Sequence, residues 1–429
     1  MEQWNEWLWL WGFLPLFALC AWRLGRFTRL APLRSLPRAL TLPFRREGSR
    51  GTMSPLQAAC TALSASIGTG NIVGTAQALL MGGPGALLWL WIGAVPGMLV
   101  RYGEIVLGQL KGGPMAYIRL ALGKRSAGLY AALALLSAFC MGNLAQANSL
   151  CAALAEEIGS FGASGFGAGW RLALGLGLAL LTWRILRGGA GAVGRAAERL
   201  VPVMGLMYLS LGAWVLLICR SALPKALALI WKEGLRPRAM TAAVLWGLRR
   251  GVFSNEAGLG TAALAHAALR AEDPRQHGLW AVFEVTADTL ICTVTGLLIL
   301  CSPAAQKYGS LPGAEALTKA LSEVVGPAPA GLLVSLSLLL FGFSTILGSS
   351  VFAGTCLRWL TGGLPPLFAP VWSLCALLGA ILPTGAVFSA ADTVNVLMAL
   401  PNLTALFLLS PELKKDAPAG APDHENLRA

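Results

Sequence analysis

The chain has 429 residues, of which 56% are hydrophobic and 12% are charged, and its mean hydropathy is +0.65. A soluble domain carries about 25% charged residues, so this composition excludes a set of soluble domains and predicts an integral membrane protein. The nine cysteines lie mostly in apolar stretches without Cys-x-x-Cys spacing, which predicts neither a disulfide framework nor a zinc site. In a soluble protein the net charge of +13 would favour nucleic acid as a partner, so the distribution of that charge matters.

Apolar segments of about 20 residues, the length that a helix needs to cross a hydrocarbon core about 30 Å thick, recur along the chain. We expect eleven transmembrane helices, over residues 7–23, 56–80, 85–109, 127–155, 170–187, 200–219, 240–267, 278–301, 329–357, 368–385 and 389–409. The first segment could instead be a cleaved signal peptide. However, Glu2 and Glu6 stand where basic residues would be needed, and eight arginines follow the segment, so we expect an uncleaved helix.

Lysines and arginines are unevenly distributed between these spans. With the N-terminus outside, the cytoplasmic segments hold 23 of them, Arg101 being counted with its neighbouring loop, whereas the outside segments hold eight. This bias follows the positive-inside rule and explains the net charge without nucleic acid. We therefore expect a multi-pass protein of a bacterial-type cytoplasmic membrane, with its N-terminus outside and its C-terminus in the cytoplasm.

Two stretches between the spans have apolar residues at helical spacing, and they cover residues 223–235 and 314–325. We expect helices there on the outer face, either as lids or as covers of helix ends. The tail from 414 to 429 is polar and rich in proline and charge, which predicts disorder.

Two of the expected helices carry glycines and polar residues near their middle. The second span contains SASIGTGNIVG over 64–74, and the seventh contains GVFSNEAGLGT over 251–261. Glycine lowers helix stability and permits other backbone conformations, so we predict that both helices break. Glycines that only allow close helix packing would not explain the polar residues beside them, which include Asn71, Asn255 and Glu256.

Paired interruptions at corresponding positions of two halves point to the binding site of an inverted-repeat transporter. The second to sixth spans and the seventh to eleventh spans would form the two repeats, about 55–219 and about 239–410. We therefore expect an all-α fold with a five-plus-five inverted repeat in a core at 51–410. An N-terminal part at 1–50, with one extra helix and a basic segment, precedes this core, and a cytoplasmic tail at 411–429 follows it.

Four blocks of sequence carry a family resemblance: GTGNIVGTAQALLMGGPGALLWLW at 68–91, KGGPMAYI at 111–118, GNLAQANS at 142–149 and RGVFSNEAGLGTAALAHAA at 250–268. In matching order, from about residue 50 to 410, the chain resembles the alanine or glycine:cation symporters, also called sodium:alanine symporters. The resemblance implies the fold of the neurotransmitter:sodium symporters. It also implies uptake of a small neutral amino acid driven by sodium.

An amino acid zwitterion inside a membrane needs donors for its carboxylate and acceptors for its ammonium group. The half-helix that follows Gly70 offers unpaired amides and about half a positive charge, so we expect the carboxylate at the amides of Gly68, Thr69, Gly70 and Asn71. The resemblance implies that the ammonium group meets carbonyls of Ser66, Phe253 and Ser254, with Asn255 beside them. It further implies that Gln146 contacts substrate, although an interhelical hydrogen bond is the alternative.

Sodium is a hard cation that prefers oxygen ligands. The ninth span carries two adjacent hydroxyls, Ser344 and Thr345, which alone would be weak support because such hydroxyls usually bond to their own helix. The resemblance implies a cage of five oxygens, made by these two hydroxyls and the carbonyls of Ser64, Ile67 and Phe341. Beyond this coupling ion, we expect no cofactor.

Charged residues inside the spans are functional candidates. Glu256 lies in the second interruption, Arg249 and Arg250 precede it, and Asp288 lies in the eighth span. Either arginine could close a gate against a carboxylate, neutralise Glu256 or form a structural pair. Glu256 could instead bind a proton, so a proton-coupled transporter of the same fold is the second candidate. A membrane enzyme would need a nucleophile, a base or a metal cluster, which the sequence does not suggest.

The residues after the Ser-Thr pair bear on substrate size. The family often has Gly-Trp-x-Tyr-Tyr there, and the resemblance implies that this tryptophan closes the side-chain pocket. Here the run is GSSVF over 348–352, so Ser349 stands where a large ring would. The resemblance implies a neutral amino acid of the alanine, glycine, serine or glutamine class. Because the ring is missing, we expect a substrate larger than alanine, such as glutamine, serine or another neutral polar amino acid, unless Phe352 or Trp372 fills the space.

Overall fold

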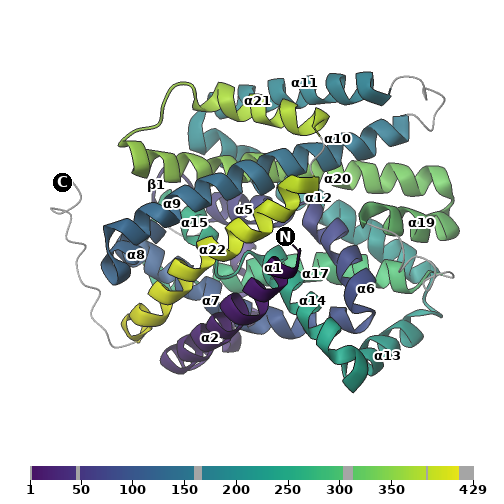
Figure 1. Ribbon diagram of the computed structural model, residues 1–429, viewed down its shortest axis with the longest axis horizontal. Coiled ribbons are helices and arrows are strands. Elements are labelled where there is room, and N and C mark those ends of the chain that lie inside the picture. Colours follow the sequence, from purple (N-terminus) through teal and green to yellow (C-terminus); the bar gives the residue numbers. More distant parts are fainter. Residues whose placement is uncertain (1, 45–48, 159–166, 303–312, 383–384, 415–429) are drawn as a thin grey trace.

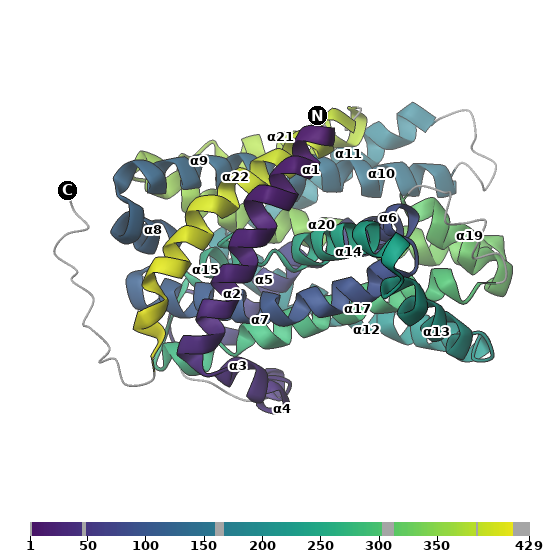
Figure 2. The ribbon, with the colours of Figure 1, turned by 60° about the horizontal axis from the view of Figure 1, so that its bottom comes forward.

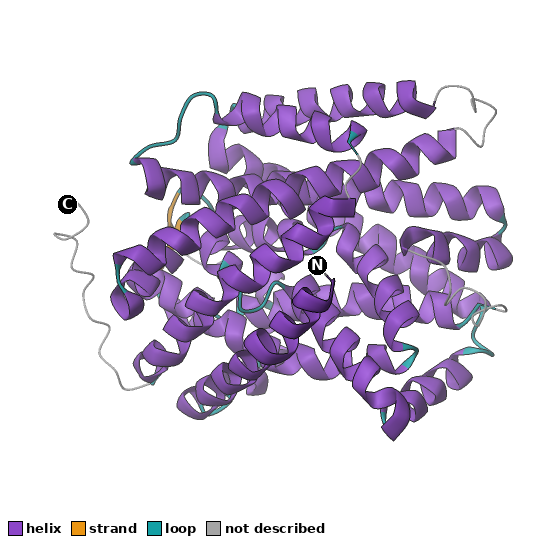
Figure 3. Cartoon of the chain, viewed as in Figure 1, coloured by secondary structure: helices purple, strands orange, loops and turns teal. Residues whose placement is uncertain are grey.

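The computed structural model describes residues 2–44, 49–158, 167–302, 313–382 and 385–414, and nearly all of them are helical (Figures 1 and 3). The helices of the first half are α1 (Glu2–Trp7), α2 (Leu14–Thr28), α3 (Ala31–Arg34), α4 (Leu36–Ala39), α5 (Pro55–Ser66), α6 (Thr75–Gly82), α7 (Gly85–Lys111), α8 (Pro114–Leu122), α9 (Lys124–Phe139), α10 (Ala145–Ile158), α11 (Gly167–Leu186) and α12 (Gly189–Ile218). Those of the second half are α13 (Leu223–Gly234), α14 (Pro237–Asn255), α15 (Thr261–His266), α16 (Pro274–His277), α17 (Trp280–Leu300), α19 (Gly313–Val325), α20 (Pro327–Thr361), α21 (Phe368–Ile381) and α22 (Gly385–Leu409).

Wider and tighter helical turns join some of these helices. The π-helical segments are η1 (Leu8–Phe13), η3 (Gly70–Gly74) and η4 (Cys140–Leu144), and short 3₁₀ turns form η2 (Leu42–Phe44) and η7 (Ser410–Leu413). The strands in the described chain are β1 (Ser49–Gly51) and β2 (Leu269–Ala271), which pair antiparallel with Ser49 opposite Ala271. Residues 415–429, most of the tail that we predicted to be disordered, lie outside the described residues.

Eight helical stretches of the described chain are long and apolar enough to cross a membrane, and the longest of them, α20, has 35 residues. Of the other three expected spans, two are the interrupted helices, and the third contains α21 with 14 residues. The expectation of a multi-pass membrane protein is therefore confirmed, whereas the count of eleven crossings stays a prediction. The two stretches predicted between the spans are indeed the helices α13 and α19, which lie at the same end of the molecule (Figures 1 and 2).

The first predicted interruption is present in the structure. α5 begins with a capping box, in which Ser54 and Gln57 satisfy each other's backbone amides, and it ends at Ser66. Ile67 then adopts an extended backbone with ψ of 92°, and helical structure resumes at Gly70. An extended residue in the middle of a membrane helix frees amides and carbonyls at this point.

The second predicted interruption is also present. α14 ends at Asn255, and Glu256 follows with φ of 52°, a left-handed conformation that is uncommon for a residue with a side chain. Gly258 and Gly260 also have positive φ, which glycine tolerates without steric cost, and α15 begins at Thr261. Because the chain turns twice in this short segment, its amides and carbonyls need partners outside the helix.

The helix α20 runs through the middle of the molecule and is buried along most of its length (Figure 1). It packs against α5, α9, α10, α12 and α19. Gly348 allows the close approach to α5, because a Cβ at this position would lie 2.2 Å from Oγ of Ser64. The N-terminal helix α2 packs against α7 and α22, and it crosses the outside of the bundle in Figure 2.

Candidate substrate and ion site

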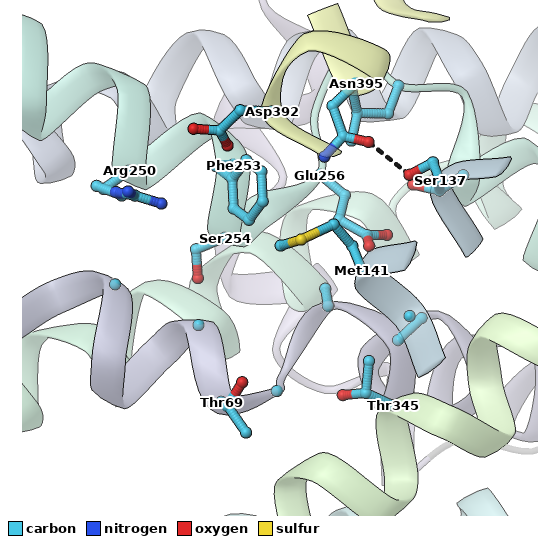
Figure 4. Close-up of a pocket in the computed structure, with 18 of the residues that line it drawn as sticks. Thr69, Ser137, Met141, Arg250, Phe253, Ser254, Glu256, Thr345, Asp392 and Asn395 are labelled. Carbon is cyan, nitrogen blue, oxygen red and sulfur yellow. Dashed lines mark hydrogen bonds between the residues drawn. The ribbon is translucent and has the colours of Figure 1, made fainter. Parts of the chain in front are cut away.

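A cavity of about 490 Å³ lies between the two interruptions (Figure 4). Its wall is formed by both broken helices together with residues of α9, η4, α10, α20 and α22. Of the residues predicted to bind substrate, those that line it are Ser66, Gly68, Thr69, Gly70, Gln146, Phe253, Ser254 and Ser349. A volume of this size is typical of pockets that enclose a small molecule.

The first interruption faces Gln146 across the cavity wall. The backbone amide and the hydroxyl of Thr69 both donate to Oε1 of Gln146, at 3.1 and 3.0 Å. The amide of Gly68 donates to Oδ1 of Asn71 at 3.0 Å, and the amide of Asn71 donates to the carbonyl of Gly68 at 3.2 Å. The expectation of four unpaired amides is therefore wrong for these three, since side chains and a local turn already supply their acceptors.

Asn71 points away from the cavity and joins the two broken helices. Its Nδ2 donates to Oδ1 of Asp288 at 2.6 Å and to Oγ of Ser254 at 3.1 Å. Ser254 in turn donates to the same carboxylate oxygen at 2.9 Å. Asn71 and Asp288 are fully buried behind the wall and do not border the cavity, so the structure gives both a place in a network between η3, α14 and α17.

The backbone of the second interruption is held by groups from other helices. Oε1 of Glu104 accepts from the amides of Gly258 and Gly260, both at 2.9 Å, and Nδ2 of Asn402 donates to the same oxygen at 2.9 Å. The guanidinium of Arg101 donates to the carbonyl of Asn255. These partners satisfy the polar backbone groups that the left-handed turn exposes.

Arg101 is not part of a cytoplasmic loop, although the charge count from the sequence assigned it to one. It is buried in α7, with 1% of its surface exposed, and Nη2 lies 2.7 Å from Oε2 of Glu284. Asn255 also differs from expectation, because it does not border the cavity and Arg101 occupies its carbonyl. A buried charge needs a partner, and the sequence offered no way to see that Glu284 supplies it.

A second buried hydrogen-bond network extends from Glu284. Oε1 of Glu284 lies 2.9 Å from Nε2 of His266, and Nδ1 of His266 lies 2.7 Å from Nε2 of His277. His277 is buried in the short helix α16. In the described part of the chain no three His, Cys, Asp or Glu side chains are grouped so that they could hold a metal ion.

The five oxygens expected to bind sodium converge where α20 meets the end of α5. The hydroxyl of Ser344 lies 2.9 Å from the carbonyl of Phe341 and 3.5 Å from that of Ser64. The hydroxyl of Thr345 lies 2.9 Å from the Phe341 carbonyl and 3.3 Å from that of Ile67. Both hydroxyls are buried, and Sδ of Met204 lies 3.3 Å from the Ser344 hydroxyl. The donor set is hard apart from that sulfur, which suits a cation that prefers oxygen.

Arg249 and Arg250 both border the cavity, and neither pairs with Glu256. Arg249 forms an ion pair with Asp392 of α22, and both residues are buried. Arg250 donates to Oε1 of Gln77. Glu256 is half-buried and also borders the cavity, so it stays a candidate proton site. Asp392, Glu104 and Glu284 are also charges inside expected spans, so the same signal marks them although they are not among the predicted site residues.

The N-terminal helical stretch reaches this ion pair. The ring of Trp9, which is 1% exposed, lies 5.7 Å from the Arg249 guanidinium carbon, and the ring of Trp246 lies 4.9 Å from the same carbon. Asn5 and Glu6 border the cavity. The part of the chain outside the expected repeats therefore forms part of the cavity wall.

Ser349 borders the cavity and packs against Gly142 of η4, where an added Cβ would lie 2.3 Å from its hydroxyl. Phe352 borders the cavity one turn further along α20, so it is positioned to take up part of the space left by a missing ring. Trp372 does not border the cavity. It is buried against Phe139 and donates from Nε1 to the carbonyl of Ile346.

Comparison with known proteins gives the family. The model of the sodium:alanine symporter family matches residues 1–418. The chain belongs to this family. It is 36% identical to the sodium/alanine symporter AgcS of Methanococcus maripaludis, over 88% of this chain and 87% of that protein. It is 35% identical to a Bacillus subtilis protein named "Probable sodium/glutamine symporter GlnT", over 90% of this chain and 82% of that protein.

Solved structures give the fold. MhsT in complex with L-phenylalanine superimposes with a TM-score of 0.67 at 16% identity, over 84% of this chain and 90% of that chain. A manganese transporter of Eremococcus coleocola superimposes with a TM-score of 0.56 at 14% identity, over 84% of this chain and 75% of that chain. The expected neurotransmitter:sodium symporter-like fold is therefore confirmed at the level of overall architecture.

Proposed function

We propose that this protein imports a small neutral amino acid together with sodium by alternating access. The observation that carries the proposal is the cavity between two broken helices, with five converging oxygens directly behind the first break. Membership of a symporter family and the names of AgcS and GlnT support it. One sodium entering down a tenfold gradient and 100 mV releases about 3.7 kcal/mol, enough for several-hundredfold accumulation of a neutral solute.

The substrate carboxylate would bind at the first break, where it replaces the Gln146 oxygen as acceptor for the amide and hydroxyl of Thr69. Gln146 accepts both of these hydrogen bonds and thereby pairs the two donors of Thr69. When substrate enters, the Gln146 amide would turn to donate to it. The ammonium group would meet the carbonyls of Ser66, Phe253 and Ser254, all of which border the same cavity.

The proposal includes a five-plus-five inverted repeat, with the two broken helices as the first members of the repeats. It also includes an N-terminus outside the cell, a cytoplasmic C-terminus and placement in a bacterial-type cytoplasmic membrane. We propose a carrier and not a channel or an enzyme, because two interrupted helices around one cavity are suited to alternating access.

Uptake of a panel of labelled amino acids into proteoliposomes tests the proposal. We expect uptake that requires an inward sodium gradient and a neutral amino acid, and counterflow of labelled substrate against unlabelled substrate. Uptake driven by a pH gradient without sodium would instead support proton coupling, for which Glu256 on the cavity wall is the candidate group. Passage without counterflow would contradict a carrier.

A further inference from the structure

A second hollow of about 260 Å³ lies between the end of α11 and the start of α12, far along the chain from the substrate residues. Three arginines line it, Arg184 from α11 and Arg195 and Arg199 from α12. All three are exposed, and among the described residues none of them forms an ion pair. Three guanidinium groups around one small hollow repel each other unless an anion joins them.

Other groups around the hollow add to its positive potential. Gly188, the residue before α12, lines it, so the helix opens onto the hollow with the free amides and the positive dipole end of its first turn. Arg195 lies over this turn, since Nη1 is 3.6 Å from where a Cβ of Gly191 would be. The nearest carboxylate in sequence, Glu198, accepts from Nε2 of Gln57 on α5 at 3.0 Å and is thereby held by another helix.

The surface next to the hollow is apolar. Leu176 and Leu180 precede Arg184 at intervals of four residues on α11, and they are 45% and 64% exposed. Val203 and Leu206 continue the line of Arg195 and Arg199 on α12, and they are 61% and 66% exposed. Residues three or four apart lie on one face of a helix. On each of the two helices, one face therefore carries arginine at the hollow and exposed apolar side chains next to it. Both helices are long and apolar enough to span a membrane.

An aromatic side chain marks the level of the membrane boundary beside the hollow. Trp183 is 39% exposed, and the guanidinium carbon of Arg187 lies 4.9 Å from its ring. Tryptophan with an adjacent basic residue is typical of the boundary between hydrocarbon and water. A hollow beside such a pair is suited to the depth of phospholipid headgroups.

We propose that this hollow binds the phosphate of an anionic phospholipid headgroup, whose acyl chains lie along the apolar lines of α11 and α12. Arginine forms paired hydrogen bonds with phosphate oxygens, and a basic pocket between membrane helices suits an anionic headgroup. Free phosphate shares the headgroup chemistry, but it would make no use of the adjoining apolar surface. The site is separate from the proposed transport function and does not depend on it.

Thermal unfolding of the delipidated, detergent-solubilised full chain tests the site. Dioleoyl phosphatidylglycerol, dioleoyl phosphatidylcholine and inorganic phosphate are added separately, and bound lipids are counted by native mass spectrometry. We expect phosphatidylglycerol to raise Tm by several degrees and phosphatidylcholine to have little effect. The variant with Arg184→Gln, Arg195→Gln and Arg199→Gln should lose more than half of this rise and retain fewer phosphatidylglycerol molecules.

A matched control carries Arg34→Gln, Arg38→Gln and Arg125→Gln, three exposed arginines on other segments that are also predicted to be cytoplasmic. This control has the same net charge as the test variant and should keep the full rise. An equal loss in both variants, or an equal rise in the wild type with inorganic phosphate alone, would overturn the proposal. If the triple variant does not fold, Arg195→Gln alone should still lower the number of retained phosphatidylglycerol molecules.

Discussion

The hydroxyl of Thr345 in α20 lies 3.3 Å from the carbonyl oxygen of Ile67, the residue at which the first broken helix becomes extended. The same hydroxyl lies 2.9 Å from the carbonyl of Phe341 in its own helix. One side chain thus lies between a carbonyl of an unbroken helix and a carbonyl freed by the break. A cation bound among these oxygens would link the two helices directly.

Replacing Ser344 and Thr345 together by alanine should weaken sodium coupling. Each of the two substitutions removes an oxygen that faces the freed carbonyls. We therefore expect the half-saturating sodium concentration for uptake to rise about tenfold or more, equivalent to about 1.4 kcal/mol. Ser350→Ala is the control, because this buried hydroxyl donates to Leu347 of its own helix at 2.6 Å. Uptake with unchanged sodium dependence in the double variant would contradict the ion site.

Replacing Gln146 by leucine should impair substrate binding more than folding. The change leaves the amide and hydroxyl of Thr69 without their acceptor and removes a donor for the substrate, so we expect kcat/KM for uptake to fall about tenfold to a hundredfold. Asn148→Ala is the control on the same helix, since Asn148 donates to the carbonyls of Gly379 and Leu382. If both variants transport equally well, Gln146 serves only as an interhelical contact.

Replacing Ser349 by tryptophan should narrow the substrate range toward glycine and alanine. Gly142 blocks one side of this position, so a large ring would have to extend into the cavity. Competition of unlabelled amino acids against labelled alanine measures the range, and Ser349→Ala separates the loss of the hydroxyl from the gain in volume. A wild type that already prefers alanine over every larger amino acid would contradict the predicted substrate size.

Replacing Trp9 by leucine should weaken the ion pair of Arg249 and Asp392, which we propose as a gate. Trp9→Leu removes a ring beside Arg249, which should cost about 0.5–2 kcal/mol and lower uptake partially. Asp392→Asn is the stronger change, because breaking a buried ion pair by removing one partner costs about 3–5 kcal/mol, and it should abolish uptake. The control is Trp11→Leu, because this ring lies in the same N-terminal stretch and is 70% exposed. Equal effects of the two tryptophan changes would show that only the membrane anchoring of the helix matters.

The orientation in the membrane can be tested at Arg38, which is exposed in α4. In a variant whose accessible native cysteines are replaced, Arg38→Cys should react with a membrane-impermeant thiol reagent only after the cells are opened. The basic bias of the segment around it predicts a cytoplasmic position. Labelling in intact cells would reverse the predicted topology.

The sequence by itself determined the class of protein and the positions of both breaks. Continuous apolar runs can be stable only in a membrane, and glycines beside polar residues such as Asn71 and Asn255 disfavour an unbroken helix whatever surrounds it. These are local properties of the chain. The resemblance to the family at the adjacent residues Ser344 and Thr345 also predicted a set of five oxygens, which the structure brings together.

The tertiary structure decided which polar group meets which partner. Asn71 and Asn255 share the interruptions with Thr69 and Ser254, yet the structure directs Asn71 to Asp288 and the Asn255 carbonyl to Arg101. In the same way Arg249 pairs with Asp392, which is 143 residues away along the chain. A buried polar group is stable only beside a complementary one, and that pairing depends on which helix faces it after packing. Spacing along a single helix carries no information about that neighbour.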